Sequence, residues 1–346
     1  GTEYSERTNK KEWLVSGDVI KPFLEQIQGR NYKITTLAAS LTWIATPVLD
    51  NYGQIVGVGM TKIDYKNTVN SEDNAYNFTD GLEQRYGVEE LGTRENRVFQ
   101  KLNSIGKNEE ILFYQATDEM MGHQYANVQQ RIVATGDILD KEFNYLRSEW
   151  QTVSKDSNKI KTFGVRGEYN TDTAGVINYT NNAYGVAYVH ENETVKLGDT
   201  LGWYAGIVHN TFKFKDIGNS KEEQLQGKFG IFKSIPFDYN NSLNWTISGD
   251  IFAGYNKMHR KYLVVDEVFN ARSRYYTHGL GVKNQLTKSF RLSESFTLSP
   301  YGALSLAYGR MTKIREKTGE VRLEVKSNDC LSIKQEIGAG LAFKHY

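Results

Sequence analysis

Hydrophobic and polar residues alternate with a period of two through most of the chain after residue 160. In the segment 243–251, apolar residues or glycine at odd positions separate the polar Asn244, Thr246, Ser248 and Asp250. Comparable runs begin near residues 161, 224, 296 and 331. Such alternation is typical of strands that have one apolar and one polar face. The pattern predicts about eight strands, several of them roughly ten residues or longer, which exceeds the usual length in soluble sheets.

The segment 96–150 has the period of a helix instead. Val98, Leu102 and Ile105 are spaced by four and three residues, and a second periodic run covers 108–121 and stops before Gly122. From 126 to 150 the apolar residues again lie near one face. The opposite face carries the candidate linker-helix residues Arg131, Asp137, Asp140 and Glu142. This amphipathic helix packs either on a soluble core or inside a barrel.

Residues 1–95 are more mixed. The segment 18–29 is predicted to form a short helix, and the runs 34–41 and 54–65 are predicted to form short strands. The expected organisation therefore has three parts. A small mixed segment covers 1–95, a helical linker covers 96–150, and a β-rich domain covers 151–346.

Composition excludes several function classes. The 42 basic and 41 acidic residues give a net charge of +1, so a polyanion-binding protein and a nucleic-acid partner are not expected. No run approaches ~20 apolar residues, which excludes a transmembrane helix but not a transmembrane barrel. Cys330 is the only cysteine, and the six histidines form no metal-ligand spacing. Neither a catalytic motif nor a cofactor motif is present, so the sequence predicts no enzyme, metal or cofactor.

The polar face of the strands distinguishes a membrane barrel from a soluble sandwich. A barrel lumen combines small and charged residues, and an aromatic girdle lies near the strand ends. The candidate lumen-facing residues are Arg166, Glu168, Lys228, Asp250, Lys334 and Glu336. The candidate girdle residues are Tyr169, Phe237, Tyr239, Tyr255, Tyr275, Tyr276, Phe296 and Tyr308. A tight turn at 238–242 and long charged loops at 257–271 and 311–328 also favour a barrel. A soluble surface or adhesive β-domain remains the alternative.

Several short motifs resemble one family. The stretch 116–126 (ATDEMMGHQYA) resembles the segment that leads into the linker helix of type Va autotransporters. Residues 161–170 (KTFGVRGEYN) resemble the first barrel strand of that family. Leu298, Pro300, Leu304 and Tyr308, and then Gly338 and Gly340, follow in the family's order. The resemblance covers about two thirds of the chain, from residue 115 onward.

The resemblance implies an antiparallel transmembrane β-barrel in the bacterial outer membrane, with the linker helix in its lumen. Such a translocator carries its own N-terminal passenger to the cell surface and has no cofactor. The implied partners are outer-membrane lipid, the barrel-assembly machinery, periplasmic chaperones and the passenger itself, and the barrel is expected to act as a monomer. Residues 1–95 would be the end of the passenger, or an autochaperone-like segment. The family barrel has twelve strands, so a chain that ends within the barrel is expected, and a complete eight-stranded barrel is the alternative.

Overall fold

The computed structural model describes residues 8–15, 38–69, 75–148, 156–194, 199–237 and 243–343. The chain divides into two compact units. Unit 1 comprises Gly1–His123, Arg260–Ala271 and Lys317–Leu323, and unit 2 comprises Gln124–His259, Arg272–Glu316 and Glu324–Tyr346. The predicted helix 18–29 and turn 238–242 lie outside the described residues, as do residues 34–37 of the predicted strand 34–41 and the girdle residue Tyr239.

Unit 1 combines a small sheet with short helices. The strands β1 (Glu12–Val15), β3 (Ile55–Lys62) and β2 (Trp43–Leu49) form an antiparallel sheet in the order β1-β3-β2. The 3-10 helix η1 (Tyr65–Thr68) follows, and then α3 (Ala75–Arg85), α4 (Arg94–Asn103) and α5 (Glu110–Met120). Val98, Leu102 and Ile105 are all buried, which confirms the helical spacing of this stretch.

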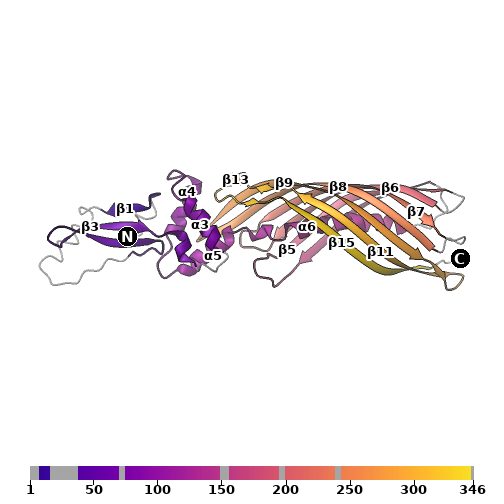
Figure 1. Cartoon of the computed structure of the whole chain (residues 1–346), viewed down its shortest axis with the longest axis horizontal. Helices are drawn as coiled ribbons and strands as arrows, with labels where there is room; N and C mark the ends of the chain where they lie inside the picture. The colour runs from indigo at the N-terminus through magenta and orange to yellow at the C-terminus, as the bar shows by residue number, and fades with distance from the viewer. Residues whose placement is uncertain are drawn as a thin grey trace. The chain divides into compact units, whose positions relative to one another are not determined.

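Unit 2 is built around long antiparallel strands. A short 3-10 helix, η2 (His123–Tyr125), precedes the long helix α6 (Val128–Ser148). The long strands are β4 (Asp156–Tyr169), β5 (Tyr179–Thr194), β6 (Asp199–Phe214), β7 (Lys221–Pro236), β8 (Leu243–Val264), β9 (Glu267–Lys288), β11 (Phe296–Met311) and β15 (Asn328–Phe343). The short strands are β10 (Phe290–Arg291), β12 (Ile314–Arg315), β13 (Thr318–Gly319) and β14 (Glu324–Val325). Figure 1 shows the long strands curving around α6.

The long strands pair in chain order, from β4 through β9 and then to β11 and β15. Over the described residues the sheet is open, with β4 and β15 at its edges. Pairing is continuous, for example from Asp156↔Asn192 to Tyr169↔Tyr179 between β4 and β5. This confirms an antiparallel sheet of about eight long strands, of the length that a membrane crossing needs. Among the described residues, no helix is both long and apolar enough to cross a membrane.

The outer face of the later strands is apolar. Ile251 is 62% exposed, Ile337 is 95% exposed, and both alternate with residues on the concave side. Ser248 and Asp250 line a cavity inside the sheet. The concave side is therefore the polar side of β8 and β15, as the alternation predicts.

The predicted loop 257–271 is wrong. β8 runs to Val264 and β9 starts at Glu267, so only a two-residue turn separates them, with Val265 at a φ of 61°. The alternation in fact continues through this charged stretch, because Met258, Tyr262 and Val264 are buried while the residues between them are more exposed. The charged residues on one face of the β8–β9 hairpin made this stretch resemble a loop in the sequence.

The two faces of β8 predict opposite responses to a charge. Arginine at Ile247 on the outer face is expected to destabilise the protein by about 2–4 kcal/mol if the residue lies at the bilayer midplane. Arginine at Ser248 points into the cavity and is expected to be tolerated. The measurement is the urea midpoint of the protein inserted in lipid vesicles. Equal damage at both positions would contradict the assigned facing.

Candidate functional site

Helix α6 packs its apolar stripe against the inner wall of the sheet. Leu139, Phe143 and Leu146 are each less than 5% exposed. They form one hydrophobic cluster with inward-facing residues of β4 to β7, namely Phe163, Ala183, Ala187, Val189, Tyr204, Val208 and Phe232. The rings of Phe143 and Tyr204 lie 4.7 Å apart between centroids. We call this contact of the helix with β4 to β7 the apolar seat.

A glycine permits the close approach of helix and sheet. A Cβ atom added at Gly206 in β6 would lie 2.9 Å from side-chain atoms of both Leu139 and Phe143. On the helix, a Cβ at Gly136 would lie 3.1 Å from Oε1 of Gln226 in β7. Small residues on both surfaces therefore set how close α6 lies to the wall.

The N-terminal half of α6 is anchored by a buried ion pair. Arg131 donates through Nε to Oε1 of Glu222 in β7 at 2.8 Å, and the two side chains are 1% and 0% exposed. Tyr275 of β9 donates to the other oxygen of Glu222 at 2.5 Å, and Gln224 donates to Oε1 at 2.8 Å. Thr135, one turn along the helix, donates to Gln224 at 2.6 Å. The network satisfies the buried carboxylate from three sides, as burial of a charge requires.

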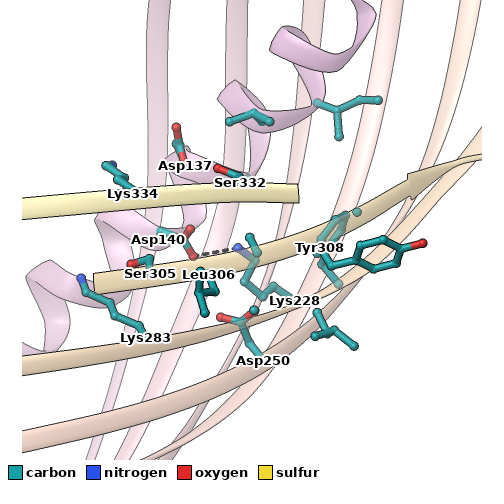
Figure 2. A pocket seen from close by; sticks show the side chains of 18 of the residues that line it. Asp137, Asp140, Lys228, Asp250, Lys283, Ser305, Leu306, Tyr308, Ser332 and Lys334 are labelled. Carbon is teal, nitrogen blue, oxygen red and sulfur yellow. Dashed lines mark hydrogen bonds and ion pairs between the residues drawn. The ribbon is translucent and has the colours of Figure 1, made fainter. Parts of the chain in front are cut away.

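Two further ion pairs fasten the middle of the helix. Asp140 accepts from the ammonium of Lys228 in β7 at 2.8 Å, and Figure 2 shows this pair with Asp250 nearby. Glu142 pairs with Lys161 of β4 at 2.8 Å. These contacts fix the rotation of α6, because Asp140 and Glu142 point to different strands.

The remaining face of α6 borders a cavity of about 510 Å³. Its wall comes from α6 and from strands β6 to β9, β11 and β15. Figure 2 shows Asp137 on the helix, Lys283 on β9 and Lys334 on β15 around this space. Lys283 also pairs with Glu336 at 3.4 Å. The helix therefore packs on the wall through an apolar cluster and ion pairs, and its other face borders a cavity lined by charged residues.

The candidate residues separate into two groups. Lys228, Asp250, Lys334 and Glu336 line the cavity together with Asp137 and Asp140. Arg166 and Glu168 do not: on β4 they alternate with Phe163 and Val165, which pack against α6. Both are exposed, and Glu168 pairs with Lys215. Because the helix covers this part of the wall, the inner face of β4 is the apolar one.

Sequence reasoning missed Glu222 and assigned Tyr275 to the aromatic girdle. Tyr275 is instead fully buried on the concave side, where it bonds to Glu222. Tyr276, its neighbour, is 55% exposed on the outer side. The signal for Glu222 was present in the alternation of β7, which puts it in phase with Gln224, Gln226 and Lys228.

A family model matches the β-rich part of the chain. The model of the autotransporter beta-domain matches residues 160–346, which is more than half of the chain. None of the curated proteins matches the chain significantly. The matched region begins in β4 and includes every strand that forms the wall around α6.

Proposed function

This chain belongs to the autotransporter beta-domain family, and from that premise we propose that α6 is the part of the exported chain that stays in the lumen and plugs it. The matched domain is an outer-membrane translocator unit, which exports the N-terminal part of its own chain to the cell surface. As a transporter, the β-domain itself is not a catalyst.

The buried pair Arg131–Glu222 carries the proposal. Because this ion pair is fully buried, water is excluded from the contact between α6 and β7 at this point. The apolar seat of Leu139 and Phe143 continues the same contact toward the C-terminal end of the helix. A helix held in this way occupies part of the interior, and the charged cavity lies beside it.

Conductance tests the plug. The protein is extracted from the outer membrane and reconstituted in planar bilayers, with and without residues 126–150. Deletion is expected to raise the single-channel conductance clearly, because a helix ~10–12 Å in diameter no longer occupies the lumen. Unchanged conductance of the inserted variant would contradict the proposal.

A second variant keeps the length of the chain. Leu139→Asp together with Phe143→Asp places charges in the apolar seat and is expected to raise conductance as well. Val133→Asp is the matched control, since Val133 is 47% exposed on the cavity side and leaves the seat intact. If Val133→Asp raises the conductance as much as the double variant does, the apolar seat does not hold the helix.

The remaining assignments extend this proposal. We assign 1–95 to the end of a passenger or an autochaperone-like segment, 96–150 to the linker and 151–346 to the barrel. The family implies insertion by the outer-membrane assembly machinery in general terms. Periplasmic chaperones as partners, an adhesive passenger and a monomeric state are proposed from the same resemblance.

A further inference from the structure

Unit 1 contains a contact between segments that are far apart in the chain. The tip of the β8–β9 hairpin (260–271) and the loop 317–323 belong to the same unit as helices α4 and α5. We call the two loop segments the receptor surface. We propose that this surface holds α4 and α5 without help from the peptide connection through α6, so that the N-terminal segment stays attached after the chain is cut between His123 and Gln124. This retention goes beyond translocation.

The contact has an apolar core to which both partners contribute. On the receptor surface, Tyr262, Val264, Phe269 and Ala271 are each 0% exposed. They share one cluster with Val98, Phe99, Leu102, Phe113, Ala116 and Met120 from the two helices. A two-stranded hairpin alone has no second layer on which to bury four such side chains. The hairpin tip therefore needs the helices as its core.

A buried arginine joins the two partners at the C-terminal end of α5. Arg260 is 0% exposed and donates to the carbonyl oxygens of Met120 at 3.3 Å and Val321 at 2.9 Å. A cation at this end of a helix is also favoured by the helix dipole. In the opposite direction, the backbone N–H of Leu263 donates to Glu119 at 3.1 Å. Separation of the partners would break the bonds to Met120 and Glu119, whereas the bond from Arg260 to Val321 lies within the receptor surface.

Complementary charges surround the apolar core. Three basic residues on one side of α4, Arg94, Arg97 and Lys101, pair with Glu320, Glu267 and Asp266 of the receptor surface. The second and third pairs have N–O distances of 2.7 Å. The hydrogen bond from Lys101 lowers the pKa of Asp266, so this carboxylate stays charged at neutral pH. Surface pairs add little energy individually, but their pattern specifies the occupant.

The test cuts the connection and asks whether the partners separate. A flexible linker with a protease site is inserted between His123 and Gln124 of the full chain. After complete cleavage, confirmed on a denaturing gel, the sample is run on size exclusion in detergent. The N-terminal piece is expected to co-elute with residues 124–346. Release of the piece in buffer without denaturant would overturn the proposal.

Matched variants identify the surface. Phe269→Ala removes a buried ring and is expected to weaken retention by roughly 100-fold or more. Val268→Ala is the control, because Val268 is the adjacent residue and is 42% exposed. Equal retention by the two variants would mean that another surface holds the piece.

A charge reversal gives a second test that leaves the apolar core intact. Glu267→Lys is expected to accelerate release roughly two- to fivefold at low salt, and less at high salt. Adding Arg97→Glu restores an opposite-charge pair and is expected to recover retention. If the double variant releases as fast as the single one, α4 does not occupy the receptor surface as proposed.

Discussion

Replacement of Arg131 by methionine is expected to destabilise the attachment of α6 to the wall by about 3–5 kcal/mol. The reason is that Glu222, which is 0% exposed, would keep its charge without its cationic partner. Tyr275 and Gln224 continue to donate to the carboxylate, so the lower part of this range is expected. The measurement is the opening free energy of α6 amides by hydrogen exchange of the protein in detergent.

Two controls separate lost charge pairing from lost packing. Lys141→Met makes the same type of change on the exposed side of the same helix and is expected to have little effect. The double variant Arg131→Met with Glu222→Met replaces the pair by apolar residues and is expected to recover most of the loss. If the double variant is as unstable as the single one, the arginine acts through packing alone.

The strands of unit 2 were predictable because a strand with one apolar and one polar face shows a two-residue period of hydrophobicity in the sequence. In β8, β11 and β15 one side is apolar and exposed, and the other side borders the charged cavity. The rule that polar residues mark the lumen therefore works for these strands. Ser248, Asp250, Lys334 and Glu336, polar residues of β8 and β15, all line this cavity.

The same rule fails where α6 covers the wall. In β4 the inner positions hold Phe163 and Val165, since they meet the apolar stripe of the helix. In β6, Tyr204 and Val208 face inward while Trp203 and Ile207 are exposed on the outer side. A strand with two apolar faces shows no clean alternation. The facing of these strands depends on a helix that no local pattern within them reveals.

The pairing of charges was also only partly predictable. The sequence indicates that Asp140 belongs to a helix and Lys228 to a polar strand face, but the rotation of the helix decides which strand Asp140 meets. The partner of Arg131 is Glu222, which is not among the candidate lumen-facing residues. Partner choice depends on three-dimensional packing, in this case on the small residues Gly136 and Gly206.

A buried lysine in unit 1 responds to pH in a direction that the geometry defines. The side chain of Lys62 is 0% exposed, pairs with Glu83 and donates to the carbonyl oxygen of Ile63 at 3.0 Å. Burial lowers the pKa of Lys62 from 10.5 to about 8, although the hydrogen bond and charge of Glu83 act against this shift. The folded unit therefore releases this proton at a lower pH than the unfolded chain does.

The stability of unit 1 is therefore expected to rise by about 2 kcal/mol between pH 8 and roughly pH 10, since the unfolded chain binds one more proton than the folded unit in this window. Above this window the gain is opposed, because burial raises the pKa of Tyr65 and Tyr86, and folded tyrosines with a raised pKa lose stability as pH increases. The protein is equilibrated in urea at each pH and then pulse-labelled by hydrogen exchange at one fixed pH. The measured quantity is the urea midpoint for the amides of α3 and α4. Lys62→Met removes the titrating group and is expected to flatten the rise, whereas Lys66→Met changes a lysine that is 36% exposed and is expected to keep it. An equal rise in the Lys62→Met variant would show that another group carries the pH dependence.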